Sequence, residues 1–149
     1  MTINQIADVQ YGEELPAFEP DTSMDTVREF ATMVGFGGGR FVDHEAARKE
    51  GFPGAIVPGV MSQGWLAAMI HNWAPEATIR SIDTVFRATV LVDEPHKING
   101  VVTDINEEDA VVEIDLTVVN SKGERAFLEQ LSWAFLYRPR QIPRFIGSS

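Results

Sequence analysis

Apolar residues in the first half of the chain recur with the period of a helix. Four of them are spaced three and four positions apart, namely Val27, Phe30, Ala31 and Val34. This spacing places all four on one face and predicts a helix with one buried side. Thr22 is expected to cap its free backbone N–H groups, and Gly35 should end it. The residues up to Pro20 show little periodicity and predict an extended arm or a short edge strand.

Two more helices are predicted before residue 76. A glycine-rich crossing over residues 36–42 should lead into a short helix that Asp43 caps and Gly51 ends. A longer helix should run from Pro58-Gly59 to Pro75. Its residues are apolar around most of the circumference, which is the pattern of a helix buried on nearly all sides.

The second half of the chain alternates apolar and polar residues, which predicts strands. Four runs have this pattern, namely residues 82–92, 98–105, 112–118 and 126–137. The third run is the clearest, because apolar residues at its even positions alternate with Glu113, Asp115 and Thr117. Turn-forming residues at 106–109 and 120–123 separate the last three runs.

Helices followed by an antiparallel meander indicate an α+β fold. A helix buried all round and long half-buried strands are both explained if a long antiparallel sheet wraps around a central helix, which is the hot-dog fold. The chain shows no linker or repeat, so residues 1–149 are expected to form one domain of this kind. An exposed sheet edge favours dimerisation, either with a copy of the chain or with another hot-dog subunit.

Composition and charge narrow the classes of partner. The net charge of −10 opposes binding to phosphate backbones and to anionic lipid, so neither nucleic acid nor a membrane is expected as a partner. The chain has no cysteine and only three scattered histidines, so we expect no thiolate catalysis, no metal and no cofactor. The absence of cysteine, of a signal-peptide pattern and of a long apolar run favours a cytoplasmic protein.

Residues 27–59 resemble the signature region of the MaoC-like (R-specific) enoyl-CoA hydratases and acyl dehydratases. That pattern reads V-x-x-F-A-x-x-x-G-D-x-N-P-x-H-x-D and ends, several residues later, in an aliphatic pair and H-G. The chain matches it at several positions, namely Val27, Phe30, Ala31, Gly35, Asp43, Ile56, Val57 and Gly59. The resemblance implies the hot-dog fold, an acyl thioester as ligand and reversible hydration of a trans-2-enoyl group as the reaction of the family.

The departures from this pattern fall on the chemistry. Phe36 occupies the position of the family's catalytic Asp, and Phe41 the position of its catalytic His. Gly38-Gly39 replaces the Asn-Pro, and Pro58 replaces the His before the glycine. Because phenylalanine cannot accept or deliver a proton, the acid–base pair that the family uses is absent from these two positions.

The resemblance also indicates where a ligand would bind. In the family, the backbone N–H at the position of Gly59 helps to hold the thioester carbonyl, and the start of a buried helix suits such an oxygen. The alternative is that Pro58-Gly59 is only a turn and a helix start. The candidate substrate-binding residues are Phe36, Phe41, Gly59, Ser62, Trp65 and Arg87. Trp65 is equally explained by core packing, and Arg87 by an ion pair within the protein.

Three residues are candidates to replace the missing acid and base, namely Asp43, His44 and His71. Each has a simpler explanation. Asp43 can cap a helix, His44 can face solvent, and His71 can be hydrogen-bonded at the rim of the core. The basic cluster of Arg138, Arg140 and Arg144 can bind phosphates or form a solvated tail.

Several functions remain open at this point. The chain could be a subunit without an acid–base pair that handles acyl thioesters together with a catalytic hot-dog partner. It could be an enzyme with changed chemistry on another conjugated carbonyl compound. It could also bind an acyl or other small apolar ligand without turnover. A hot-dog thioesterase would need a carboxylate near the start of the buried helix, for which Asp83 is the one candidate.

Overall fold

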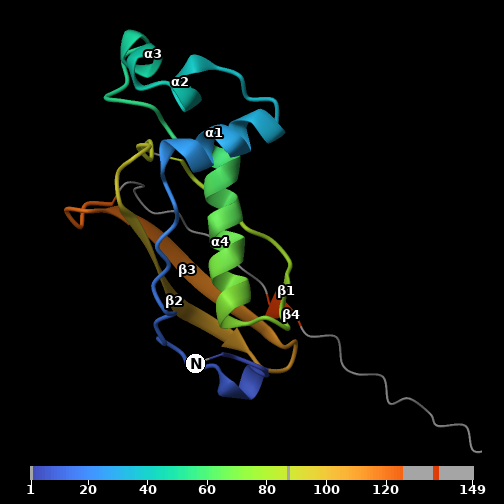
Figure 1. Ribbon diagram of the computed structural model, residues 1–149. Helices are drawn as coiled ribbons and strands as arrows, with labels where there is room; N and C mark the ends of the chain where they lie inside the picture. Colours follow the sequence, from blue (N-terminus) through green and yellow to red (C-terminus); the bar gives the residue numbers. More distant parts are fainter. Residues whose placement is uncertain (1, 87, 126–135, 138–149) are drawn as a thin grey trace, which may run out of the picture.

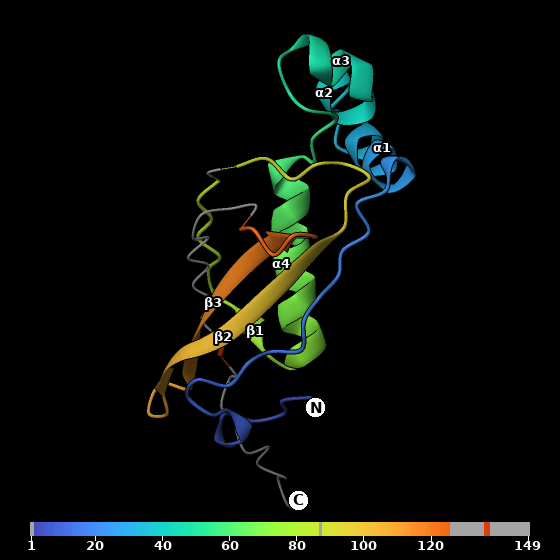
Figure 2. The ribbon, with the colours of Figure 1, turned by 90° about the vertical axis from the view of Figure 1, so that its left-hand side faces the viewer.

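The computed structural model describes residues 2–86, 88–125 and 136–137 of the 149 (Figure 1). The helical elements are η1 (Ile6–Asp8), α1 (Met24–Met33), α2 (Gly39–Val42), α3 (His44–Lys49) and α4 (Gly59–Trp73). The strands are β1 (Thr78–Ile79), β2 (His96–Asn106), β3 (Val111–Asn120) and β4 (Leu136–Tyr137). The long helix α4 lies along one face of the β2–β3 hairpin, and α1, α2 and α3 lie beyond its N-terminal end (Figures 1 and 2).

Helix α4 begins and ends where the sequence predicts. Pro58 precedes its first residue and Ala74 follows its last, and seven of its fifteen residues are buried. Leu66 and Ile70 are completely buried and pack in one core with strand residues such as Ile98 and Ile114. The predicted helix against the sheet is therefore confirmed, but burial on nearly all sides is wrong for the described residues, because Val60, Gly64, Ala68 and His71 are exposed along one side of α4. In the described part of the chain, no helix combines the length and apolar character that crossing a membrane requires.

The β2–β3 hairpin confirms two of the predicted strands. The strands are antiparallel, with Ile98 opposite Val118 and Gly100 opposite Leu116, and the residues of β3 alternate between buried and half-buried positions. Asn106 builds the turn, because its side-chain oxygen accepts from the Asp109 N–H at 3.0 Å. Close packing explains the glycine at position 100, because a Cβ there would lie 2.8 Å from a methyl group of Leu116.

The N-terminal segment forms the predicted extended arm. It runs along the free edge of β2, where the Leu15 N–H donates to the Gly100 carbonyl at 2.9 Å. Phe18 exchanges backbone hydrogen bonds with Ile98 in both directions, at 3.0 and 2.7 Å. The arm therefore covers one edge of the hairpin with short bridges rather than with a regular strand.

The start of α1 corrects one prediction. Ser23, not Thr22, caps the helix, since the Ser23 hydroxyl accepts from the Thr26 N–H. The Thr22 hydroxyl is buried and donates instead to the Glu94 carbonyl at 2.6 Å, because this carbonyl lies within its reach. Gly35 ends the helix as predicted, with a φ of 76° that suits glycine. The glycine-rich crossing is partly helical, since Gly39 begins the short helix α2.

The strand predicted over residues 82–92 is wrong for the described part of that run. Its even positions do not share one face, because Phe86 is half exposed whereas Val90 and Val92 are buried. Val90 and Val92 form backbone hydrogen bonds with residues 55–57, rather than with a neighbouring sheet strand. Most of the run predicted over 126–137 lies outside the described residues, and its last two residues form β4, antiparallel to β1.

Candidate functional site

The first turn of α4 leaves backbone donors without acceptors. Pro58 precedes the helix and offers no side-chain cap. Its carbonyl accepts from the N–H groups of Met61 and Ser62, at 3.0 and 3.3 Å. Within the described residues, no acceptor pairs with the N–H of Gly59 or of Val60. These donors stand at the positive end of the helix dipole, so the site suits a carbonyl oxygen that gains negative charge.

A buried hydroxyl group lies one turn into the same helix. Ser62 is only 2% exposed, and its Oγ has no hydrogen-bond partner among the described protein groups. Ser62 follows Gly59 by three residues, so the two lie on one side of α4. Helical side chains lean toward the N-terminus of their helix, which directs this hydroxyl toward the first turn. Burying a hydroxyl unpaired costs about 1–3 kcal/mol, so a polar group of a ligand would gain a ready partner here.

Segment 80–90 supplies one further residue to this site, Phe86, which sequence reasoning missed. The Phe86 ring lies directly on Gly59, where a Cβ would come within 3.0 Å of its Cζ atom. Thr84 stands two positions earlier, and its Oγ1 is also buried without a hydrogen-bond partner among the described groups. The sequence signal was the apolar alternation of this run, which assigned Phe86 to a strand and left Thr84 unremarked.

The two positions of the family's acid–base pair hold a stack of aromatic rings. The centroids of the Phe36 and Phe41 rings are 5.8 Å apart, with an angle of 28° between the ring planes. The Arg40 guanidinium lies 6.0 Å from the Phe41 ring centroid, within the range of a cation–π contact. The Arg40 carbonyl accepts from the Ile56 N–H at 2.9 Å, which ties this stack to the segment that leads into α4.

Asp43 and His44 take separate partners, and the structure does not bring them together as a pair. The Asp43 carboxylate caps α3 by accepting from the Ala46 N–H at 2.8 Å, and this hydrogen bond lowers the pKa of Asp43. The His44 Nδ1 accepts from the Ala55 N–H at 3.0 Å. The neutral ring therefore carries its proton on Nε2, which lies 2.7 Å from Oδ2 of Asp93. His44 is thus a bridge between chain segments rather than a solvated side chain.

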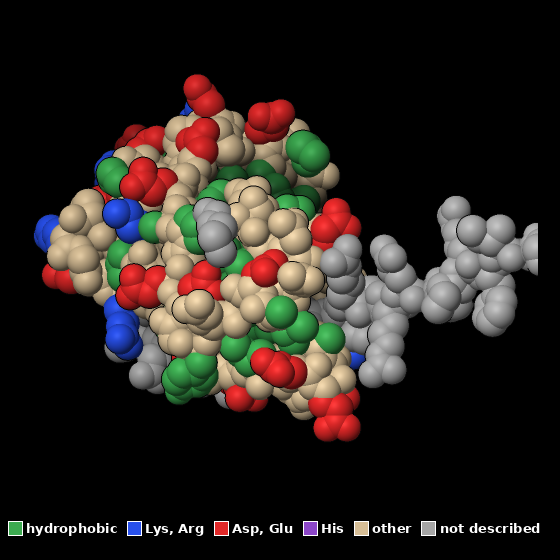
Figure 3. Space-filling model, turned by 90° about the horizontal axis from the view of Figure 1, so that it is seen from below, with side chains coloured by type: hydrophobic (Ala, Val, Ile, Leu, Met, Phe, Trp, Pro, Cys, Tyr) green, Lys and Arg blue, Asp and Glu red, His purple; other side chains and the backbone are tan. Residues whose placement is uncertain are grey.

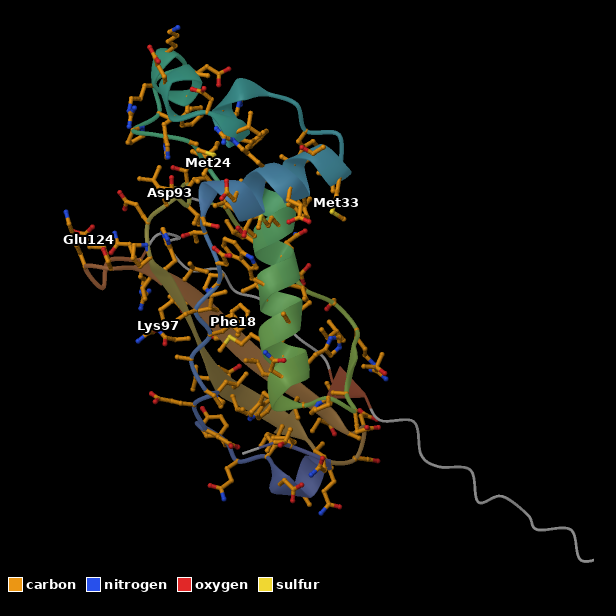
Figure 4. All side chains as sticks on the ribbon, in the orientation of Figure 1. Phe18, Met24, Met33, Asp93, Lys97 and Glu124 are labelled. Carbon is orange, nitrogen blue, oxygen red and sulfur yellow. The ribbon has the colours of Figure 1, made fainter. Side chains whose placement is uncertain are left out.

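Asp93 completes this bridge at the start of α1. Its Oδ1 accepts from the Met24 N–H at 2.9 Å, and Figure 4 shows the two residues side by side. The hydrogen bond from His44, followed by the one from Met24, lowers the pKa of Asp93. Its φ of 65° is tolerated by Asp and Asn but strained for most other residues. The bridge fixes α1 and α3 to the loop that follows the site segment.

We expect Asp93→Asn to destabilise the protein by about 1 kcal/mol at neutral pH. Asparagine tolerates the positive φ of this position, but its side chain has one acceptor oxygen and cannot accept from both Met24 and His44. The lowered pKa means that the folded state favours the carboxylate. Its contribution is therefore complete above about pH 4, the unfolded value, and is lost as pH falls through the lower folded-state value. Urea unfolding at several pH values should show wild type and variant converging in acid. Asp83→Asn, at an exposed position, should leave stability unchanged at every pH.

The remaining candidate residues lie elsewhere. His71 is exposed near the far end of α4, twelve residues after Gly59 and so about 18 Å along the helix. Trp65 stands one turn beyond Ser62 and belongs to the core. Arg87 lies outside the described residues. The described residues contain no group of three or more His, Asp or Glu side chains that could hold a metal ion.

Comparison with known proteins supports this architecture. No curated protein sequence shows significant similarity to the chain. The R-hydratase PhaJ1 of Pseudomonas aeruginosa is similar in structure, with a TM-score of 0.79 and 18% identity over 91% of this chain and 85% of that one. A chain of the ChsH1–ChsH2 complex of Mycobacterium tuberculosis has a TM-score of 0.76 and 18% identity, over 87% and 99% of the two chains. A chain of the HadBC (3R-hydroxyacyl-ACP dehydratase) complex of the same organism has a TM-score of 0.66 and 16% identity, over 85% and 96%.

The family comparison covers the site itself. The family model of the MaoC like domain matches residues 41–123, more than half of the chain. The match includes α4 with Gly59 and the β2–β3 hairpin, and it begins at Phe41, so it leaves Phe36 outside. The structural matches confirm the predicted α+β hot-dog fold. The chain therefore belongs to the MaoC-like domain family.

Proposed function

We propose that this chain is an acyl-thioester-binding subunit of a MaoC-like hydratase or dehydratase, and that a second hot-dog subunit supplies the acid and the base. The ligand would be an enoyl or 3-hydroxyacyl group on coenzyme A or on a carrier protein, and the chain would act as one hot-dog unit. The observation that carries this proposal is the Phe36–Phe41 stack, because two packed rings occupy the positions at which the family pattern has its proton-transferring pair.

The start of α4 supports the binding role. Its unpaired N–H groups and the buried Ser62 hydroxyl can receive the thioester carbonyl and one further oxygen of the acyl group. The rings of Phe36, Phe41 and Phe86 would form apolar walls. By contrast, Asp43 and His44 are engaged in structural hydrogen bonds, and His71 lies far from Gly59. This placement favours a subunit without its own acid–base pair over an enzyme that recruits those three residues.

Apolar side chains exposed at the α1–α4 end support a partner subunit. Six large apolar residues are between 39% and 78% exposed on elements near the start of α4, namely Met33, Val34, Phe36, Val60, Val85 and Phe86. Figure 4 shows Met33 projecting outward from the end of α1. Contiguous exposed apolar surface marks interaction sites. Two of the similar structures come from complexes, ChsH1–ChsH2 and HadBC, which is consistent with this assignment.

The test separates binding from turnover. The purified chain should bind crotonyl-CoA or a longer enoyl-CoA in calorimetry, yet its hydration of the enoyl bond, followed by absorbance, should stay at the background rate. Adding a hot-dog subunit that carries the Asp and His of the family pattern should restore hydration. If a homodimer of the chain hydrates enoyl-CoA unaided, the proposed need for a catalytic partner subunit is contradicted. If the chain binds no acyl-CoA, the proposed class of ligand is contradicted.

Ser62→Ala should change stability and binding in opposite directions. The substitution removes a buried hydroxyl without a partner, so the free energy of unfolding should rise by about 1 kcal/mol. Affinity for the acyl thioester should fall several-fold, because the ligand loses a hydrogen bond. Thr22→Val is the matched control, since it removes a buried hydroxyl that is bonded to Glu94 and lies on another element. It should lower stability and leave affinity unchanged in the folded protein.

A further inference from the structure

Residues 55–57 are buried, and one residue separates them from the first turn of α4. Three other parts of the chain hold their N–H groups. The Ile56 and Val57 N–H groups donate to backbone carbonyls, at 2.9 and 2.8 Å. The Ala55 N–H donates instead to Nδ1 of the His44 side chain, at 3.0 Å. One of the three bonds that position the entry to α4 therefore depends on the protonation of a side chain.

The neutral His44 ring has a partner at each of its nitrogens. Its Nδ1 accepts from Ala55, and the proton on its Nε2 faces Oδ2 of Asp93 at 2.7 Å. Gly54 lets the ring lie this close to the backbone, because a Cβ there would be 3.0 Å from Nδ1. The neutral form with its proton on Nε2 is therefore the form that makes both bonds.

A second proton on the His44 ring removes the bond to Ala55. Protonated Nδ1 is a donor, so it would face the Ala55 N–H with no acceptor between them. Ala55 is completely buried, and a buried N–H that loses its acceptor carries its full desolvation cost. The ion pair gained with Asp93 offsets little of this cost, because the two side chains are 31% and 49% exposed and solvent screens their charges. Protonation therefore favours release of residues 55–57.

Histidine is the side chain type that ordinarily changes its charge between pH 5 and 8. Hydrogen bonds from the Ala46 N–H and from His44 lower the pKa values of Asp43 and Asp93, so both stay ionised in this range. Arginine, lysine and glutamate side chains also ordinarily keep their charge there. On the elements around His44 these are Arg28, Glu45, Arg48, Lys49 and Glu94, and residues 53–57 contain no ionisable side chain.

The field of the whole molecule acts on every histidine. Asp and Glu side chains are also numerous at the end of the molecule away from α1–α3, as Figure 3 shows. A net charge of −10 attracts protons to all three histidines, whatever their local partners. An effect specific to His44 must therefore be compared with the same substitution at another histidine.

We propose that neutral His44 is a positioning residue, which holds residues 55–57 and through them the first turn of α4, and that its protonation releases this segment. The inference rests on the acyl-thioester site proposed above and adds a pH dependence to it. Affinity for the thioester falls several-fold as pH falls from about 8 to about 5.5, because the N–H groups of the first turn lose their fixed place.

Calorimetry with crotonyl-CoA at these two pH values tests the dependence. His44→Gln should keep the wild-type affinity at the higher pH, because its amide can accept from Ala55 and donate to Asp93. It cannot take up a proton, so it should lose much less affinity at the lower pH. The phosphates of the probe titrate equally with every variant. His71→Gln is the matched control at an exposed position of α4 and should keep the wild-type pH profile. His44→Ala should bind weakly at both pH values.

Hydrogen exchange without ligand tests the hold on residues 55–57 separately. The protection of the Ala55 N–H should fall several-fold between the two pH values in the wild type and not in His44→Gln, whereas the Ile98 N–H in β2 should stay protected in both. Equal pH profiles of the wild type and His44→Gln, in exchange or in binding, would overturn the role of His44. Exchange that follows the expected pattern while crotonyl-CoA binds to neither protein would support the role of His44 and contradict the acyl-thioester site.

Discussion

Replacing Gly59 by alanine should weaken acyl-thioester binding by about tenfold or more, because in enzymes a misplacement of about 1 Å at the reacting group can cost on the order of 10²-fold in rate. The new Cβ would lie 3.0 Å from Cζ of Phe86 and would stand beside the unpaired N–H groups of the first turn. The ligand would lose its close approach to the backbone. Isothermal titration with an acyl-CoA measures the loss, and reconstituted hydration measures it independently.

Gly64→Ala is the matched control on the same helix. A Cβ at Gly64 would meet nothing within 4 Å, and the residue is exposed. Because alanine is a better helix former than glycine, Gly64→Ala should raise the free energy of unfolding by about 1 kcal/mol and leave binding unchanged. Equal affinities of the two variants would contradict the role given to the start of α4.

Phe86→Ala separates two causes of the Gly59 effect. If the added methyl acts by pushing the Phe86 ring into the ligand's space, Gly59→Ala should cost much less affinity when Phe86 is already alanine. If the methyl obstructs the ligand directly, the loss should be the same in both backgrounds. We expect the direct effect to dominate, since the half-exposed Phe86 ring can shift by a few tenths of an ångström.

The elements with local signals were the predictable part of this fold. Prolines bracket α4, Asp43 caps α3, and Gly35 and Gly51 end helices with positive φ angles. Each of these features depends on a few neighbouring residues, so the sequence determines it without knowledge of the tertiary structure. The alternation in β3 succeeded for a similar reason, because one face of the strand is buried along its whole length.

The predictions that were wrong concern features that depend on partners far away in the sequence. Thr22 has the chemistry of a cap, but its hydroxyl donates a hydrogen bond to a carbonyl 72 positions away. His44 looked like a solvated or catalytic residue, and only the folded chain brings Ala55 and Asp93 to its two ring nitrogens. Residues 82–92 have the composition of a strand, yet alternation cannot reveal that Val90 and Val92 bond to residues 55–57.

The candidate site also has residues that the sequence predicts and residues that it does not. The family pattern identified Gly59 and the two phenylalanines from their spacing alone. It could not identify Phe86, because the place of this ring beside Gly59 depends on the path of segment 80–90 in the folded chain. A sequence also cannot show that a buried serine hydroxyl lacks a hydrogen-bond partner, because this depends on the groups that the fold places around its Oγ. Burial and unmet hydrogen bonds are properties of the fold, and they support the binding role proposed for the start of α4.

Leu66→Ala should be the most destabilising single substitution considered, at about 2–5 kcal/mol, a large part of the 5–15 kcal/mol typical of a whole domain. Leu66 is completely buried in the middle of the helix around which the fold is built, so its truncation leaves a cavity in the core. Val60→Ala trims an apolar side chain on the same helix that is 49% exposed and should cost little stability. Urea unfolding compares the two directly. Because Val60 belongs to the exposed apolar surface, its truncation should instead weaken association with the partner subunit, and the reverse ranking in either measurement would contradict this division of α4 into a core face and a partner face.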